Sequence, residues 1–203
     1  MAFGKIITQA FWNILPNDTL DINLVNGDSL TGEQYDAVIH AITSMDSIEL
    51  PDNLLNENDS DSKSIYYLGW AGAMTEAQKD NTGETIPSNY NIVQSSTGDS
   101  DIIIQFENEL NPDGFTGYTR TILEDDEIIM SYIKIYDTDN LSISDLTTIV
   151  RHEFGHALGL GHSTNVEDLM APNIITNVPY ISECTVSNIQ NLYDVEFTNT
   201  ECI

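Results

Sequence analysis

The sequence predicts an α/β sandwich formed by a single domain over residues 1–203. Segments that alternate like strands lie between segments whose apolar residues recur at helical spacing, which is typical of a sheet covered by helices. One segment, Ile102–Phe106, is an apolar run, as expected for a central strand buried on both faces. A chain of 203 residues that is 40% hydrophobic can bury such a core.

The first part of the chain is expected to hold one strand and one helix. Residues Thr19–Val25 alternate as a strand, and residues 26–28 supply its turn. Thr31 and Gln34 form a capping box, which predicts that a helix begins there. The apolar face of this helix would carry Tyr35, Val38, Ile39, Ile42 and Met45.

The segment over residues 65–79 is ambiguous. It follows a polar loop at residues 52–63. Its large side chains could pack on one helical face, but Gly69 and Gly72 weaken a helix. The residues of that face are Tyr66, Tyr67, Trp70 and Met74.

The remaining elements are strands followed by two helices. Residues 92–94, 117–123 and 128–136 are expected strands, with residues 117–123 at an edge and a turn at residues 124–127. Ser142 or Ser144 caps the next helix, whose buried side would carry Leu146, Ile149, Val150 and Ala157. Residues 182–193 are expected to form a closing helix.

The first of these two helices carries most of the histidines in the chain. His152, His156 and His162, three of four, fall within eleven residues. His152 and His156 are four residues apart, so on a helix they lie on one face, one turn apart. Imidazole is a good ligand for Zn²⁺, and three protein ligands leave a fourth position for water.

His162 can join this site only if the chain leaves the helix before it. At six residues beyond His156, a continuous helix would have turned by roughly 600° and would point His162 away. Gly159 can supply the turn, because glycine adopts a positive φ without steric cost. Glu153 is adjacent to a ligand and can lie beside the water without occupying the metal position.

The string from His152 to His162, HExxHxxGxxH, resembles the zinc signature of the metzincin metallopeptidases. Ser163, directly after it, resembles the pattern of the matrixin (matrix metalloprotease-like) family. Residues 168–172, Asp-Leu-Met-Ala-Pro, resemble the Met-turn, which would place Met170 beneath the zinc. Pro172 also resembles matrixins, since astacins carry tyrosine there.

The resemblance implies a particular form of α/β fold. This is a twisted, mostly parallel five-stranded sheet with one antiparallel edge strand, a backing helix and an active-site helix. An N-terminal subdomain would cover residues 1–159. A small C-terminal subdomain over residues 160–203 would hold the Met-turn and the closing helix.

The resemblance also implies a zinc endopeptidase that acts on peptide or protein substrates. Glu153 would serve as general base and then general acid, with water activated by the zinc. A substrate would pair with the edge strand, and an apolar side chain would enter a pocket between the active-site helix and the segment after Met170. The residues expected to contact substrate are Tyr118, Thr119, Thr148 and Pro172.

Other functions stay open at this point. The chain could be a metzincin peptidase outside the matrixins, or a zinc-bearing binding or adhesion module without turnover. Glu153 argues against the second, because a purely structural zinc needs no general base. The remaining histidine, His40, lies off the apolar face of its helix and is expected at the surface, so one zinc and no structural zinc site is expected.

The chain is strongly acidic. It has 33 Asp and Glu residues against six Lys and Arg, a net charge of −27, so nucleic acids and anionic membranes are disfavoured partners. Calcium is a candidate ligand, because the loop at residues 108–114 and the turn at residues 124–127 could meet at one end of the sheet. The proposed ligands are Asp113, Asp125, Asp126 and Glu127, with a solvated acidic surface as the alternative.

No segment is long and apolar enough to span a membrane, and the start of the chain lacks the apolar core of a signal peptide. A peptidase of this type leaves the cell, so we expect a secreted or extracellular monomer whose leader is missing from this chain. Cys184 and Cys202 are expected to form a disulfide, which would stabilise the fold by about 3 kcal/mol. Two free buried cysteines are the alternative.

Overall fold

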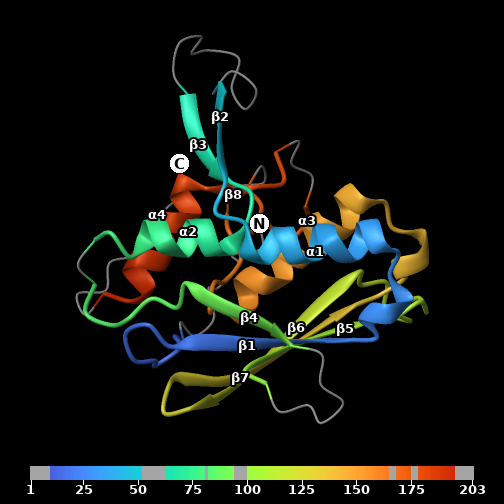
Figure 1. Ribbon diagram of the computed structural model, residues 1–203, viewed down its shortest axis with the longest axis horizontal. Helices are drawn as coiled ribbons and strands as arrows, with labels where there is room; N and C mark the ends of the chain where they lie inside the picture. The colour runs from blue at the N-terminus through green and yellow to red at the C-terminus, as the bar shows by residue number, and fades with distance from the viewer. Residues whose placement is uncertain are drawn as a thin grey trace.

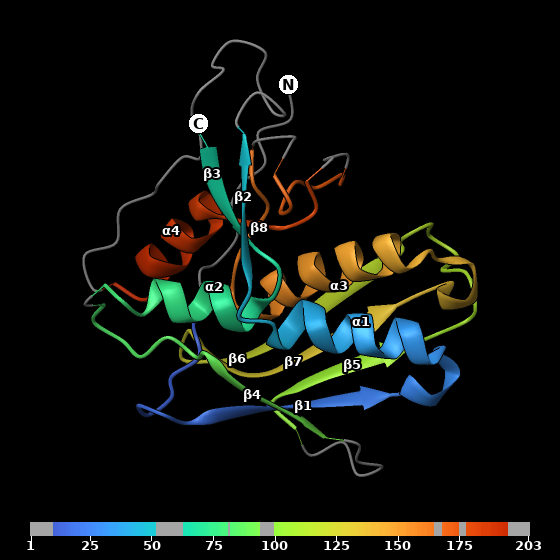
Figure 2. The same cartoon turned by 45° about the horizontal axis from the view of Figure 1, so that its top comes forward.

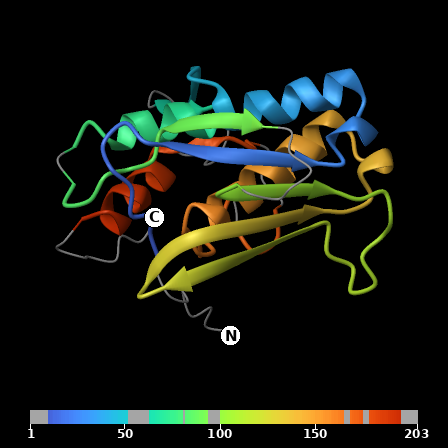
Figure 3. The same ribbon diagram turned by 60° about the horizontal axis from the view of Figure 1, so that its bottom comes forward.

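Helices cover one face of a five-stranded sheet in the computed structural model (Figures 1 and 3). The structure describes residues 10–51, 63–80, 82–93, 100–164, 168–174 and 178–194. The strand order is β4-β1-β5-β7-β6. Only β6 runs antiparallel to its neighbour, so the predicted mostly parallel sheet with one antiparallel edge strand is confirmed. The strands are β1 (Thr19–Val25), β4 (Asn89–Val93), β5 (Ile102–Phe106), β6 (Gly117–Glu124) and β7 (Glu127–Ile135).

The central strand β5 is buried on one face only. Ile102, Ile104 and Phe106 point into the core, while the residues between them are half-buried. The prediction of burial on both faces is therefore wrong for this strand, because the helices lie on one side of the sheet (Figure 3).

Two long helices lie side by side on that face, and local sequence determines where they begin. In α1 (Gly32–Thr43), the amide of Gln34 donates to Thr31 Oγ1 at 3.2 Å, and Thr31 donates to Gln34 Oε1 at 3.0 Å. In α3 (Ile143–Ala157), the amide of Asp145 donates to Ser142 Oγ at 3.1 Å, which makes Ser142 the cap. Helix α3 also packs on β6 and β7, and this contact sets the position of the site.

Residues 65–79 do not form one helix. The segment divides into β3 (Lys63–Tyr67) and α2 (Trp70–Ala77). β3 pairs with β2 (Ser47–Pro51) on one side and with β8 (Ile181–Ser182) on the other. The resulting antiparallel sheet, of which β2 and β3 project beyond the helices in Figure 2, was not predicted from the sequence.

Gly69, expected to weaken a helix, instead permits close packing where α1 meets α2. A Cβ atom on Gly69 would lie 2.6 Å from Ser44 N and 2.8 Å from His40 O. The amide of Gly72 donates to Ser44 O at 3.0 Å. The two helices therefore touch through their backbones, which only glycine allows.

The C-terminal part of the described chain closes the core. Helix α4 (Glu183–Leu192) begins at Ser182, whose Oγ accepts from the amide of Thr185 at 3.1 Å. The buried hydroxyl of Tyr193 accepts from the amide of Trp12 at 3.3 Å. Short 3-10 turns, η1 (Gly27–Ser29) and η3 (Thr138–Asn140), follow β1 and β7.

The structure also bears on the membrane and disulfide predictions. Within the described residues, no helix combines the length and apolar character that crossing a membrane requires. Cys184 is disulfide-bonded, and Cys202 lies outside the described residues.

Candidate metal centre

Three histidine side chains meet beside the end of α3. The Nε2 atoms of His152 and His156 are 3.1 Å apart, and the ring centre of His162 is 4.7 Å from that of His156. One nitrogen from each of the three rings lies within 4.8 Å of the others. Two nitrogen ligands of a tetrahedral zinc lie about 3.3 Å apart when each bond is about 2.0–2.1 Å, so this donor set fits zinc.

Gly159 brings His162 to the other two. It has a φ of +99°, and a Cβ atom there would lie 2.0 Å from Ala10 O. The amide of Leu160 donates back to Gly155 O at 3.0 Å, which closes the turn after the helix. The chain therefore leaves the helix between the second and third histidines, as their spacing requires.

Backbone carbonyls hold the two helical imidazoles in orientation. His152 Nδ1 lies 2.8 Å from Leu169 O, and His156 Nδ1 lies 2.8 Å from Leu160 O. A carbonyl only accepts, so each Nδ1 carries the proton and each Nε2 presents a lone pair. Sequence reasoning missed both carbonyls, because backbone acceptors leave no signal in residue type.

The surroundings keep the histidines neutral. Burial, followed by the neighbouring His152, lowers the pKa of His156 to about 4. Burial also lowers the pKa of His152 and of His162. Neutral imidazole is the form that binds a metal, so the three rings are prepared as ligands near pH 7.

Met170 packs against the ligand helix at Gly155. A Cβ atom on Gly155 would approach Met170 Sδ to 2.6 Å, so the missing side chain makes room for the methionine. Asp168 Oδ1 accepts from the amide of Met170 at 2.7 Å, and the amide of Ser163 donates to Met170 O at 2.8 Å. The turn that holds Met170 is thus tied to the residue after His162.

The side chain of Glu153 extends from α3 to the edge strand β6, and the residue is 7% exposed. Thr119 Oγ1 donates to Glu153 Oε2 at 2.7 Å, and a Cβ atom on Gly117 would lie 2.5 Å from Oε1. Burial raises the pKa of Glu153 to about 7, and the hydrogen bond from Thr119 opposes that rise. The role of Gly117 was missed, although glycine in an edge strand is a signal of close approach.

Of the four residues predicted to contact substrate, Thr119 is the one whose side chain bonds to Glu153. Thr119 faces Glu153, whereas Tyr118 pairs with Lys134, is half exposed and points to the opposite face of the sheet. Thr148 is half-buried on α3 and donates its hydroxyl to Ser144 O at 2.7 Å. Pro172 is exposed beside the turn of Met170.

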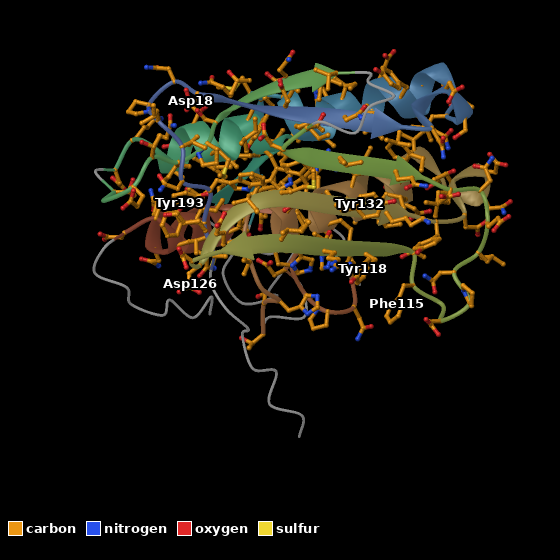
Figure 4. The ribbon with its side chains drawn as sticks, turned by 90° about the horizontal axis from the view of Figure 1, so that it is seen from below. Asp18, Phe115, Tyr118, Asp126, Tyr132 and Tyr193 are labelled. Atoms are coloured by element: carbon orange, nitrogen blue, oxygen red, sulfur yellow. The ribbon has the colours of Figure 1, made fainter. Side chains whose placement is uncertain are left out.

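The four predicted calcium ligands do not converge. Asp113 precedes β6, while Asp125 and Asp126 form the hairpin turn after it, with φ values of 50° and 67°. Eight residues of strand extend about 27 Å, and Figure 4 shows Phe115 and Asp126 at opposite ends of β6. The prediction that one calcium ion is held by both groups of residues is therefore wrong. Glu127 Oε1 instead accepts from Asn13 Nδ2 at 2.8 Å.

This fold, with its histidine triad, defines a metzincin-type domain. The matrixin family model (Peptidase_M10) matches residues 73–194, more than half of the chain, and the chain therefore belongs to the matrixin family. The alternative of a metzincin outside the matrixins is thereby overturned. Matrixins bind zinc, and the histidine triad is compatible with that.

Three curated proteins are similar to part of this chain. Matrix metalloproteinase-20 of Homo sapiens is 33% identical over 113 residues, covering 50% of this chain and 23% of that protein. Interstitial collagenase of Equus caballus is 40% identical over 57 residues, covering 28% and 12%. Stromelysin-1 of Rattus norvegicus is 38% identical over 60 residues, covering 28% and 13%. The match thus spans less than a quarter of each relative.

Proposed function

We propose that this chain is a zinc-dependent endopeptidase in which Glu153 is the general base and then the general acid. The observation that carries the proposal is a buried carboxylate, Glu153, directly after the first of three histidines whose ring nitrogens lie within 4.8 Å of one another. Membership of the matrixin family supports zinc endopeptidase chemistry in general.

Each step follows from the position of a side chain. His152, His156 and His162 would hold a zinc ion, which would acidify the attacking water and polarise the scissile carbonyl. Glu153 takes the proton of that water, and its buried setting stabilises the neutral carboxyl that results. The same group then gives the proton to the leaving amine nitrogen. Thr119 restricts the rotation of the carboxylate through its hydrogen bond.

The edge strand offers a binding site for an extended peptide. Among the residues that the structure describes, β6 pairs with β7 on one side only, so its outer backbone groups can pair with a substrate strand. Tyr118 would then contribute through its backbone, because its side chain faces away from Glu153. An apolar substrate side chain would enter between α3, at Thr148, and the segment after Met170, at Pro172.

The wider organisation is part of the same proposal. Residues 1–203 would form one catalytic domain with subdomains 1–159 and 160–203, and a core that extends from Ala10 to Tyr193 supports this. We propose a secreted or extracellular monomer. A disulfide between Cys184 and Cys202 would suit that environment. Calcium would bind at one end of β6 only, either near Asp113 or at the hairpin turn.

The test combines metal content with peptide cleavage. The purified protein should contain one zinc per chain and should cleave a quenched peptide until a chelator is added. Glu153→Gln should keep the zinc and lose activity by about 10²–10⁴-fold, because general acid–base catalysis contributes that much. Glu33→Gln, an exposed carboxylate on α1, is the matched control and should behave like wild type.

Two outcomes would contradict the proposal. Activity of Glu153→Gln within a few-fold of wild type would place the base elsewhere. A protein that binds zinc and cleaves no peptide would instead support the binding or adhesion module.

A further inference from the structure

The residue before the first metal ligand is a buried arginine. Arg151 is 5% exposed and lies about 200° around α3 from Glu153, away from the edge strand. Burial lowers the pKa of its guanidinium to about 10. Among the described residues, no carboxylate lies within 4.0 Å of this cation. A buried charge without an ionic partner requires other compensation.

That compensation comes from two carbonyls and one aromatic ring in distant segments. Arg151 Nε donates to Leu68 O at 2.8 Å, and Nη1 donates to Pro179 O at 3.3 Å. The guanidinium carbon lies 5.2 Å from the centre of the Tyr180 ring. The carbonyl of Arg151 accepts from Trp70 Nε1 at 2.9 Å. One residue thus joins α3, the end of β3 and the segment before β8.

We propose that Arg151 is a positioning residue that fixes residues 178–181 (the wall segment) and thereby sets the side-chain preference of the cleft. The inference rests on the proposed function, in which the chain after Met170 bounds the pocket at Pro172. Residues 178–181 open the next described stretch of that chain. The start of that chain is held by His152 Nδ1 at Leu169 O. Arg151 holds the wall segment, beside the pairing of Tyr67 with Ile181.

The shape of the guanidinium suits this role. It donates to Leu68 O and Pro179 O in different directions and still presents a flat face to Tyr180. A lysine could satisfy one carbonyl and would lose the stacking. A methionine would leave both carbonyls unpaired. Figure 2 shows β8 beside β3, on the helical side of the main sheet, so the sheet formed by β2, β3 and β8 would loosen together with the wall segment.

The experiment compares Arg151→Met and Arg151→Lys with Lys79→Met, a matched control at an exposed lysine. Hydrogen exchange of the zinc-loaded protein is followed in residues 63–69 and 178–182, with residues 102–106 and 127–135 as internal reference. In Arg151→Met, loss of two hydrogen bonds should speed exchange in the first two segments by about 5-fold or more and leave the reference unchanged. Arg151→Lys should give a smaller change, and Lys79→Met none.

A peptide mixture then tests specificity. Arg151→Met should keep one zinc per chain, raise KM for the peptides that wild type prefers by several-fold, change kcat less, and broaden the side-chain preference. Unchanged exchange at residues 178–182, or an unchanged cleavage profile, would overturn the role of Arg151. If the methionine variant does not fold, the lysine variant decides by the same criteria.

The two proposals fail in different ways. A wild-type protein that cleaves no peptide overturns the proposed function and, with it, the specificity role. Wild-type activity combined with an unchanged profile in both Arg151 variants overturns only the inference about Arg151.

Discussion

Two residues of the edge strand position the carboxylate of Glu153, one by allowing a close approach and the other by a hydrogen bond. Gly117 lets the strand backbone come close, and Thr119 supplies a hydroxyl 2.7 Å from Oε2 and 2.9 Å from the backbone oxygen of Glu153. A hydroxyl has one proton to donate, so it favours the acceptor that carries charge. Thr119 therefore restrains the base most firmly when Glu153 is ionised.

Thr119→Val should test this restraint, because valine keeps the shape of threonine and removes the hydroxyl. A hydrogen bond to a charged group contributes about 1.5–3 kcal/mol, of which part is lost when the carboxylate reorients. We expect kcat to fall by about 10-fold, since each 1.36 kcal/mol of barrier is a factor of ten. KM should stay near the wild-type value.

Thr119→Ser provides the control, since serine restores the donor without the methyl group. Steady-state kinetics on one peptide measures all three proteins. A valine variant whose kcat equals that of wild type, or a serine variant as slow as valine, would show that the hydroxyl does not position Glu153.

At the residue scale, the sequence predicted the positions of those side chains that depend only on local backbone geometry. Helix periodicity predicts that His152 and His156 lie on one face of α3. The need to turn the chain before His162 predicts the role of Gly159. The partners of these residues come from elsewhere in the chain. Leu169 O, Thr119 and the surroundings of Arg151 depend on tertiary contacts, which no spacing rule contains.

Among the elements, the junction of α1 with α2 is the most tightly constrained. Gly69 is the N-cap of α2 and has an ordinary φ of −137°, so its backbone would accept another residue. The obstacle is space, because the backbone of Ser44 occupies the position of a Cβ atom. The cost of a substitution there is therefore a packing cost.

Gly69→Ala should lower the free energy of unfolding by about 1–3 kcal/mol, the usual cost of forcing one extra carbon into a filled space. Gly32→Ala is the matched control, since a Cβ atom there meets nothing within 4 Å. It should be neutral or slightly stabilising, because alanine favours helix more than glycine does. Urea unfolding of both variants measures the difference. If Gly69→Ala and Gly32→Ala had equal free energies of unfolding, α1 and α2 would move apart at no cost.

The same junction explains which elements the sequence predicted well. The capping box of α1 and the serine caps of α3 and α4 are local. Helix α1 begins where its capping box predicts, and α3 begins after Ser142, one of the two serines expected to cap it. β3 was missed because its partners are β2 and the distant β8. From the sequence alone, Gly69 and Gly72 were expected to weaken a helix. They are contact points once α1 lies against α2.

For the whole molecule, the main electrostatic fact is the excess of acidic groups. Six Lys and Arg residues cannot neutralise 33 carboxylates. Lys63, Lys79 and Lys134 each pair with a glutamate, and the first two pairs are largely exposed. Such pairs contribute little. The folded state concentrates the remaining charges, so repulsion among them opposes folding.

Salt should therefore stabilise this protein. Raising NaCl from about 0.05 M to about 1 M shortens the screening length from over 10 Å to about 3 Å, which removes most repulsion between exposed carboxylates. We expect the midpoint of thermal unfolding to rise steadily over this range. A midpoint that stays constant or falls would show that repulsion contributes little to the free energy of unfolding.

The hairpin turn gives this prediction a local form. Residues 124–127 are all acidic, and Asp126 has a φ of 67°, which asparagine also tolerates. Asp126→Asn removes one charge without straining the backbone, so it should raise the midpoint of thermal unfolding at low salt and have little effect near 1 M NaCl.

Calcium added at fixed ionic strength separates screening from binding, because a cation bound to the native turn raises the midpoint beyond the effect of NaCl. If Asp126→Asn also abolished that extra rise, calcium would be bound at the turn end of β6. An extra rise that survives the substitution would exclude Asp126 as a calcium ligand.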